Sequence, residues 1–145
     1  MIHDKLDNFQ IGKAIQIRSG EKVAIFSTGA ICDQVIEAEK TLKEKGINPA
    51  IYSFPTVKPI DQQTIELCAR QFELIVTVEE HNIVGGFGSG VADIISSLSG
   101  ERSQLLKIGL EDQYSAVVGT QMYLRDIYGM SATKIVSKIG EALHA

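Results

Sequence analysis

Two short, uninterrupted apolar runs constrain the fold of this chain more than any other feature of its sequence. Residues 23–26 read VAIF, and residues 74–78 read LIVTV. Apolar runs of this length, without polar alternation, are typical of strands that are buried on both faces of a sheet. The chain is therefore expected to contain a central sheet that helices cover from both sides.

Extended and helical patterns alternate around these two runs. We expect further strands at residues 14–18, 50–54 and 105–109, and the remainder after residue 109 to be helical. Apolar residues recur at helical spacing between the strands: Ile31, Val35, Ala38 and Leu42; Ile65, Cys68 and Ala69; Val91, Ile94, Ile95 and Leu98; Ile135, Ile139 and Leu143. Parallel strands joined by helical crossovers place helices on both faces, which predicts a three-layer α/β/α sandwich.

Helix ends are marked by residues that suit them chemically. Asp61 is a good N-cap for the short helix that follows it, and Ser131 is predicted to cap the last helix. Gly46 suits the left-handed position just after the first helix. Met122 and Ile127 are expected in one further helical piece.

Length and charge exclude several functional classes. The 145 residues fit one domain, expected at residues 12–145 after a polar tail or linker at residues 1–11. The net charge of −4 is spread over interspersed residues, so nucleic acid is not an expected partner. No apolar run reaches the roughly 20 residues of a membrane span, and no secretory signal is visible. Cys32 and Cys68 are interpreted as buried structural thiols, and the expected compartment is the cytoplasm.

The stretch at residues 76–90, which reads VTVEEHNIVGGFGSG, is the strongest candidate for a functional site. Here an apolar strand is predicted to stop at Glu79, Glu80 and His81, and a glycine-rich turn then starts a helix. Ligands or partner chains usually meet an open α/β sheet at such a place. The segment with Gly85, Gly86 and Gly88 does not match the Walker motif of phosphate-binding loops, because it has no lysine. It also does not match the glycine fingerprint of dinucleotide-binding domains. These glycines are expected to let the helix start close against the sheet or a neighbouring domain.

The polar residues of this stretch do not form a visible active site. Glu79 and Glu80 are adjacent on a strand and therefore point to opposite faces, where they cannot share one substrate. His81 could act as a general base, but no nucleophile is marked as its partner. His3, His81 and His144 are scattered, so no metal site and no catalytic residue is predicted.

A second strand-to-helix turn, at Thr28 and Gly29, leaves two interpretations open. The free amides at a helix N-terminus, together with a hydroxyl, could hold a phosphate or a carboxylate. Alternatively, the turn is merely tight and Thr28 caps the helix that follows it.

A series of motifs follows in a fixed order along residues 12–142. The motifs are Gly12-Lys13-Ala14, Gly20-Glu21-Lys22-Val23-Ala24-Ile25, Thr28-Gly29, Lys58-Pro59-Ile60-Asp61, Val78-Glu79-Glu80-His81, Gly85-Gly86-Phe87-Gly88-Ser89, Ile108-Gly109-Leu110-Glu111-Asp112, Gly119 and Tyr128-Gly129-Met130. In this order and spacing the chain resembles the C-terminal domain of transketolase and related thiamine-diphosphate enzymes. These relatives include 1-deoxyxylulose-5-phosphate synthase and the beta subunits of 2-oxoacid dehydrogenases.

The resemblance implies a five-stranded, mostly parallel sheet in which the first strand, at residues 14–18, is an antiparallel edge strand. It also implies that thiamine diphosphate and Mg²⁺ are bound in the complete enzyme by two other domains, not by this chain alone. The implied role here is a docking domain that supports the dimer, inactive by itself. Tyr114 stands where relatives often carry phenylalanine, and Glu111 where proline or lysine is common. Tyr128-Gly129-Met130 favours transketolase over the synthase.

Three hypotheses result. The first is a C-terminal domain, or a fragment of a split subunit, of an enzyme that transfers two-carbon ketol units between sugar phosphates. Its partners would be thiamine-diphosphate-binding domains and a second copy of the chain. The stretch after Glu80 and the loop at residues 55–59 are its candidate contact surfaces, and mutation of Glu79 is expected to impair assembly. The second is a free-standing module that binds an anion or a nucleotide. The third is a hydrolase built on Glu79, Glu80 and His81.

Overall fold

The predicted apolar runs form the centre of a five-stranded sheet in the computed structural model, which describes residues 9–144. The expected tail therefore lies mostly outside the described residues, as does His3. The strands are β1 (Ile15–Arg18), β2 (Val23–Ser27), β3 (Ala50–Ser53), β4 (Leu74–Asn82) and β5 (Gln104–Leu110). Their order is β1-β3-β2-β4-β5, and only β1 is antiparallel to its neighbour. The mixed sheet with an antiparallel edge strand is thus confirmed.

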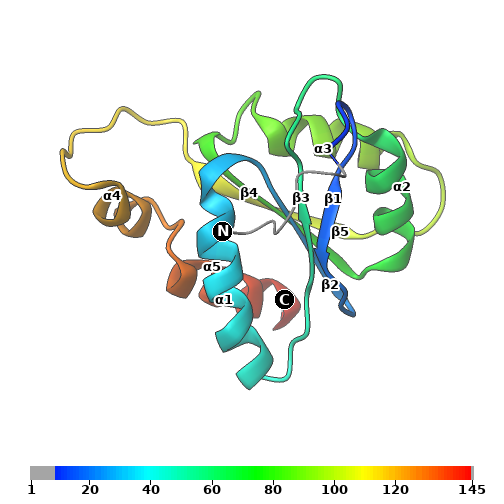
Figure 1. Ribbon diagram of the computed structural model, residues 1–145, viewed down its shortest axis with the longest axis horizontal. Coiled ribbons are helices and arrows are strands. Elements are labelled where there is room, and N and C mark those ends of the chain that lie inside the picture. The colour runs from blue at the N-terminus through cyan, green and yellow to red at the C-terminus, as the bar shows by residue number, and fades with distance from the viewer. Residues whose placement is uncertain (1–8, 145) are drawn as a thin grey trace.

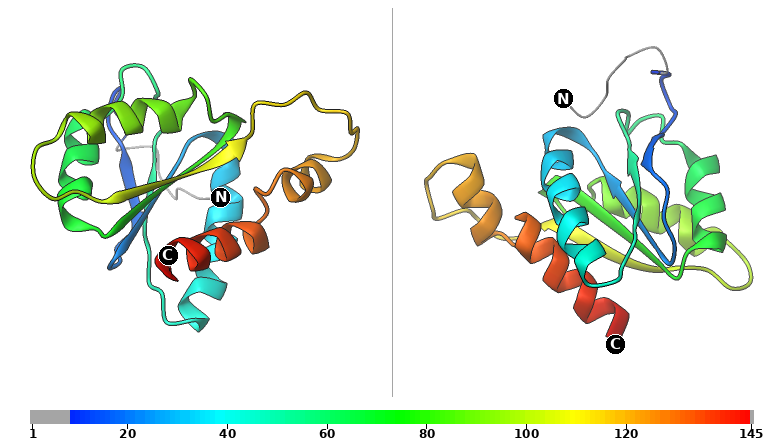
Figure 2. Two further views of the ribbon diagram at one scale, coloured as in Figure 1. Left: turned by 180° about the vertical axis from the view of Figure 1, so that it is seen from behind. Right: turned by 60° about the horizontal axis from the view of Figure 1, so that its bottom comes forward.

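Helices cover both faces of this sheet (Figures 1 and 2). The helices are α1 (Cys32–Glu44), α2 (Gln62–Gln71), α3 (Phe87–Ser97), α4 (Gln121–Ile127) and α5 (Ala132–His144), and a single 3-10 turn, η1 (Gly29–Ile31), precedes α1. Alternate residues of β2 divide the core between the two faces. Val23 and Ile25 pack with α1 and α5, whereas Ala24 and Phe26 pack with α2 and α3. The three-layer α/β/α sandwich is confirmed.

The helix ends confirm part of the predicted capping. Asp61 accepts a hydrogen bond from the backbone nitrogen of Thr64 at 3.3 Å, as an N-cap should, and another from the backbone nitrogen of Ala14 at 2.9 Å. The Ser131 hydroxyl instead donates to Asp126 at 2.7 Å, and Gln34 of α1 accepts from the first amide of α5, that of Ala132. A side chain of α1 therefore holds the start of α5, which the sequence did not predict.

Strand β4 is longer than predicted. The expected strand ended before Glu79, but β4 continues through Glu80 and His81 to Asn82. The reason lies in the neighbouring strand, because β5 runs on to Leu110 and pairs with β4 as far as Asn82. The pairing is irregular after Val78 and resumes at Asn82, opposite Leu110, so the polar side chains do not end the strand.

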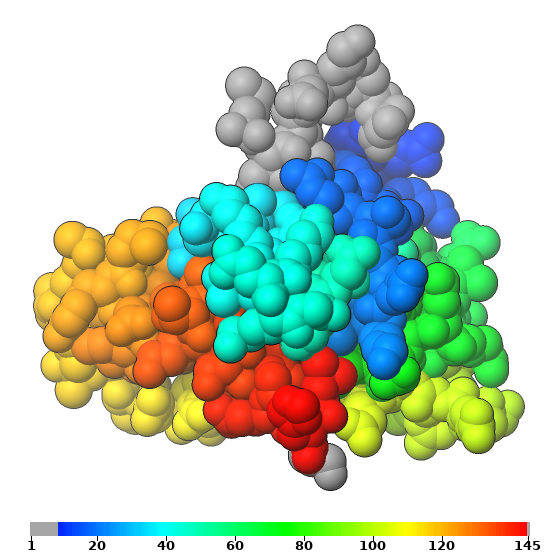
Figure 3. Space-filling model, turned by 90° about the horizontal axis from the view of Figure 1, so that it is seen from below, coloured from blue at the N-terminus to red at the C-terminus, as the bar shows by residue number. Residues whose placement is uncertain are grey.

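Residues 111–128 form a projection that we call the arm. It comprises the loop at residues 111–120 and helix α4, and it stands away from the sheet beside α1 and α5 (Figures 1 and 3). The prediction that this whole region is helical is wrong for the loop, which ends with Val117, Val118, Gly119 and Thr120, all poor helix formers. Met122 and Ile127 do share α4, but their exposed fractions are 55% and 44%.

Candidate functional site

The carboxylate of Glu79 closes the N-terminus of α3. Its side chain is fully buried and accepts hydrogen bonds from the backbone nitrogens of Phe87, at 2.6 Å, and Gly88, at 2.7 Å. The first amides of a helix have no partner within the helix, and a negative charge beside them is favourable. The anion at the glycine-rich turn is therefore Glu79 itself.

The glycines of this turn leave room for that carboxylate. A Cβ atom on Gly88 would lie 3.0 Å from the Glu79 Oε1 atom and 2.6 Å from the Thr77 hydroxyl oxygen. On Gly86 it would overlap the other carboxylate oxygen, Oε2. Gly85 has a φ of +76°, a conformation that suits glycine. The expectation that the glycines let α3 start close against the sheet is confirmed.

Glu80 points to the opposite face of the sheet, as predicted for a residue adjacent to Glu79. Its carboxylate accepts hydrogen bonds from Arg125 at 2.7 and 3.1 Å, and from Gln121 at 3.0 Å. Arg125 also binds Asp33 of α1 at 3.0 Å, and its own exposed fraction is only 2%. The hydrogen bonds from Arg125 lower the pKa of Glu80, and the hydrogen bonds to Glu80 raise the pKa of Arg125. This cluster joins α4 to both β4 and α1.

His81 lies at the carboxyl edge of the sheet, exposed to solvent. It lines a shallow hollow of about 430 Å³ together with Val57, Val84 and the turn at Gly85. The exposed fractions of Val57 and Val84 are 47% and 66%. The two predicted contact surfaces, after Glu80 and in the loop at residues 55–59, therefore meet in one place. We call this place the edge surface, defined by Val57, His81, Val84 and Gly85.

The second candidate turn is held together by bonds within the chain. The Thr28 hydroxyl donates to the carbonyl oxygen of Phe54 at 2.9 Å and makes no capping hydrogen bond to the following helix. The interpretation of Thr28 as a cap is therefore wrong. Gly29, with a φ of +76°, begins the short η1 turn. The Thr28 hydroxyl thus joins β2 to the end of β3.

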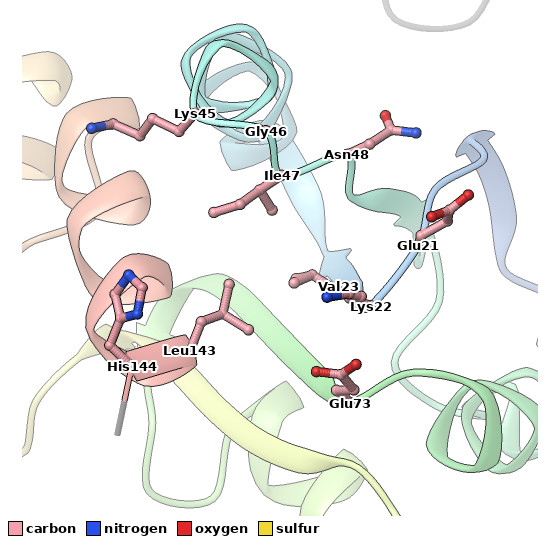
Figure 4. A pocket seen from close by; sticks show the side chains of 10 residues that line it. All are labelled: Glu21, Lys22, Val23, Lys45, Gly46, Ile47, Asn48, Glu73, Leu143 and His144. Carbon is pink, nitrogen blue, oxygen red and sulfur yellow. The ribbon is translucent and has the colours of Figure 1, made fainter.

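A hollow that sequence reasoning did not single out lies at the amino edge of the sheet (Figure 4). It measures about 370 Å³, and Ile47 and Leu143 provide apolar lining. Charged side chains of both signs surround it, namely Glu21, Lys22, Lys45 and Glu73, and His144 lies beside them. Lys45 points away from the other lining side chains (Figure 4). Because the charges are of mixed sign, the hollow has no clear preference for an anionic or a cationic ligand.

The turn before α3 does not fit a diphosphate with its metal ion. Within residues 9–144 there is no group of three histidine, cysteine or acidic side chains that could hold a metal. At the start of α3, an external phosphate would have to displace the buried Glu79 carboxylate. Over the same residues, none of the helices is long and apolar enough to cross a membrane.

Comparisons with known proteins give one consistent likeness. The family model described as "Transketolase, C-terminal domain" matches residues 12–135. A transketolase family protein of Sinorhizobium fredii is 38% identical over 136 residues, which cover 93% of this chain and 39% of that protein. A 1-deoxy-D-xylulose-5-phosphate synthase of Dictyoglomus thermophilum is 34% identical over 138 residues, covering 95% of this chain and 22% of the synthase.

A solved structure shares the fold over almost the whole chain. It is described as "Split gene transketolase, inactive beta4 tetramer", and the superposition has a TM-score of 0.89 at 28% sequence identity. The match covers 99% of this chain and 46% of that one. The chain therefore spans less than half the length of each of these relatives.

Proposed function

The chain belongs to the transketolase C-terminal domain family, and from this premise we propose that it serves a thiamine-diphosphate-dependent transketolase-type enzyme. It would be the C-terminal domain of that enzyme, or part of a split subunit. The complete enzyme would transfer two-carbon ketol units between sugar phosphates, in the cytoplasm. Thiamine diphosphate with Mg²⁺ would supply the carbanion chemistry from other domains. This chain would perform no chemical step and would act in docking.

One observation carries the docking role. The glycine-rich turn before α3 is closed from within, because Glu79 occupies the helix N-terminus where a phosphate would otherwise bind. The adjoining edge surface instead presents the apolar side chains of Val57 and Val84 to solvent. Exposed apolar side chains of this kind favour a protein partner over a charged small molecule.

The start of the described chain enlarges the edge surface. The backbone nitrogen of Gly12 donates to the Thr56 hydroxyl at 2.8 Å, which places this segment along the loop at residues 55–59. Phe9 and Ile11, just before it, have exposed fractions of 50% and 72%. Their apolar area adds to that of Val57, so a partner domain docked here would remove several apolar side chains from water.

Two measurements test the proposal. Calorimetric titration of the chain alone with thiamine diphosphate and Mg²⁺ should show no specific binding, and micromolar affinity would refute the proposed role. The chain should then form a complex with the thiamine-diphosphate-binding domains of the same enzyme, and only the complex should transfer ketol units. Domains that are fully active without the chain would also contradict the proposal.

The likeness to the synthase of Dictyoglomus thermophilum supports a second candidate within the same class. The chain would then complete a 1-deoxyxylulose-5-phosphate synthase. The same reconstituted complex decides between the two, because it would form deoxyxylulose phosphate in place of transferring ketol units between sugar phosphates. A 2-oxoacid dehydrogenase beta subunit is a third member of this set, and oxidation of a 2-oxoacid by the complex would identify it.

Assembly with a second copy of the chain is also part of the proposal. The similar protein of known structure is described as a beta4 tetramer, which is consistent with self-association of such subunits. Light scattering over a range of protein concentrations tests this directly, and a strict monomer at high concentration would contradict it.

A further inference from the structure

The hollow at the amino edge of the sheet has a charged side and an apolar side. Lys22 and Glu73 lie together on one side of it, and Ile47 and Leu143 lie opposite them (Figure 4). Ile47 and Leu143 are partly buried and pack against the core beneath the hollow. The hollow therefore offers one cation, one anion and an apolar surface to the same ligand.

The charged side consists of Lys22 and Glu73, because Glu21 and Lys45 point away from it (Figure 4). Among the described residues, the side chains of Lys22 and Glu73 form no ion pair with each other or with any other residue. Their positions are nevertheless linked, since the backbone nitrogen of Glu73 donates to the carbonyl oxygen of Lys22 at 2.9 Å. The ammonium and the carboxylate are thus carried side by side, where both can bind one ligand.

Lys22 has a backbone conformation that lysine rarely adopts. Its φ is +62°, and within residues 9–144 it is the one residue other than glycine with a positive φ. The backbone nitrogen of Val23 donates to the carbonyl oxygen of Glu21 at 2.7 Å, so Lys22 is the central residue of a strained γ-turn. Glycine or asparagine would fit this position with less strain. Backbone strain of this kind occurs mainly at functional sites.

A ligand that fits the hollow carries both charges and an apolar group. An α-amino acid does so, because its carboxylate and its ammonium group are attached to the same carbon atom. The carboxylate would bind the ammonium of Lys22, and the ammonium group would bind the carboxylate of Glu73. An aliphatic side chain would then lie against Ile47 and Leu143. The volume of about 370 Å³ is at the lower end of the roughly 300–1,000 Å³ of small-molecule sites, which suits a small ligand.

Other classes of small molecule fit this hollow less well. A phosphate would be attracted by Lys22 but repelled by Glu73 beside it, and a simple cation would meet the reverse arrangement. A purely apolar ligand would cover both charged groups without offering them a partner, which is unfavourable. Of these ligands, the zwitterion alone satisfies Lys22 and Glu73 together.

We propose that this hollow binds a free α-amino acid with an aliphatic side chain, such as leucine. The site lies at the amino edge of the sheet, opposite to the edge surface, and the inference does not rest on the docking role. The bound amino acid would contact the starts of β2 and β4 through Lys22 and Glu73, and the end of α5 through Leu143. It would thereby stabilise the folded chain.

Thermal unfolding of the whole chain in the presence of L-leucine tests the proposal. Leucine should raise the Tm in a saturable way at concentrations up to about 10 mM, since a ligand that binds only the folded chain stabilises it. N-acetylleucine lacks the ammonium group, leucinamide lacks the carboxylate and glycine lacks the side chain, so each should bind at least about tenfold more weakly. No saturable shift with leucine, or equal shifts with N-acetylleucine and leucinamide, would overturn the proposal.

Variants of the two charged residues test the site itself. Lys22→Asn removes the ammonium, and asparagine tolerates a positive φ, so the free chain should be at least as stable as the unmodified one. Glu73→Gln removes the carboxylate at an exposed position. Each variant should weaken leucine binding at least about tenfold in calorimetric titration. Unchanged binding by both variants would overturn the proposal.

Two variants at the carboxyl edge of the sheet are the matched controls. Lys58→Gln and Glu111→Gln remove the same charges at exposed positions far from the hollow, and they should bind leucine as the unmodified chain does. If they weaken binding as much as Lys22→Asn and Glu73→Gln do, leucine responds to overall charge and the hollow is not its site.

NMR spectroscopy provides an independent readout of the position of the site. Titration with leucine should shift the backbone amide resonances of Lys22, Glu73 and Leu143, and leave that of Val84 on the edge surface unchanged. Shifts confined to another part of the chain would overturn the assignment to this hollow. Because these experiments use the chain alone, their failure would leave the docking role intact, which is tested with the thiamine-diphosphate-binding domains.

Discussion

The Glu79 Oε1 atom lies 2.7 Å from the backbone nitrogen of Gly88, nine residues further along the chain. The other carboxylate oxygen accepts from Phe87 at 2.6 Å, so one buried side chain binds two helix amides. This arrangement joins the end of β4 to the start of α3 and removes the need for an external anion. The carboxylate thus binds the free amides of the turn and takes the position that an external anion would occupy.

Glu79→Gln should destabilise the domain. The neutral amide offers one acceptor oxygen, and its NH₂ group would face a helix amide that also donates. Hydrogen bonds to charged groups contribute roughly 1.5–3 kcal/mol, so we expect a loss of about this size in the free energy of unfolding. Urea denaturation measures it. Glu111→Gln, at an exposed position of the arm, is the control and should change stability by less than about 0.5 kcal/mol. Equal stability of the two variants would contradict the role of Glu79.

Gly88→Ala should also destabilise the domain, by about 1–3 kcal/mol, because the added methyl group is forced against a close-packed site. It would press on the Glu79 carboxylate and the Thr77 hydroxyl. Gly140→Ala provides the matched control within helix α5. A Cβ atom there meets nothing within 4 Å, so the substitution should be neutral or stabilise by up to about 1 kcal/mol. Thermal unfolding of both variants compares them, and a stable Gly88→Ala variant would show that the turn tolerates a side chain.

The sequence could predict most of the fold because buried strands and amphipathic helices leave periodic signals. It could also predict that Glu79 and Glu80 face opposite sides, because that follows from strand geometry alone. It could not predict which of the two meets α3, since that depends on the face to which the chain crosses after the turn. The length of β4 was missed for a related reason, because its partner β5 lies more than twenty residues away.

The arm was missed because nothing local in the sequence marks it. Its position depends on Arg125, which pairs with Asp33 across 92 residues of sequence. An arginine in a short helix is ordinarily exposed, so its burial could not be inferred from periodicity. The exposed apolar side chains of the loop also resemble core residues when only the sequence is known. Only the ion pairs of Arg125 in the folded chain show that these side chains are exposed on the arm and do not belong to the core.

Arg125→Met should release the arm from the body. The methionine keeps much of the apolar stem but leaves Glu80 and Asp33 without their cation. Breaking a buried ion pair costs roughly 3–5 kcal/mol, and we expect about 2 kcal/mol here because water can solvate the half-exposed Asp33. Limited proteolysis should cut residues 111–120 faster in this variant. Arg102→Met, which removes an exposed arginine, should match the unmodified chain in both measurements.

Low pH should reduce the free energy of unfolding of the domain, because Glu80 and Asp61 become protonated. Hydrogen bonds from Arg125 lower the pKa of Glu80 from its ordinary value of 4.5. Burial opposes the same change at Asp61, but hydrogen bonds from Ala14 and Thr64 outweigh it and lower the pKa from 3.8. A lowered pKa in the folded state means stability that is fully present above the ordinary value and is lost as the pH falls through the folded value. Unfolding free energies should therefore decline below about pH 4.5.

The Arg125→Met variant distinguishes the contribution of Glu80 to the acid sensitivity from that of Asp61. It lacks the cation that lowers the pKa of Glu80, so it should lose less stability on acidification than the unmodified chain does. The difference in unfolding free energy between the two proteins should thus shrink as the pH falls from 7 to 3, when measured by urea denaturation at fixed ionic strength. A constant difference over this range would show that the pair of Arg125 and Glu80 makes no pH-dependent contribution.

Val84→Asp should impair docking at the edge surface without unfolding the domain. Val84 is 66% exposed, so a carboxylate there stays hydrated in the free chain and should change the unfolding free energy by less than about 0.5 kcal/mol. In a complex it would be buried without a cation, which we expect to weaken binding to the thiamine-diphosphate-binding domains at least about tenfold. Calorimetric titration of those domains with each variant measures this.

The comparison with Leu67→Asp makes the docking test specific. Leu67 is 61% exposed on α2, so the same charge is introduced at a similarly exposed apolar position outside the edge surface. If both variants bind equally well, the partner docks elsewhere and the edge surface has no role in it. If only Val84→Asp fails to bind and ketol transfer by the mixture falls in parallel, the domain contributes to the reaction through assembly.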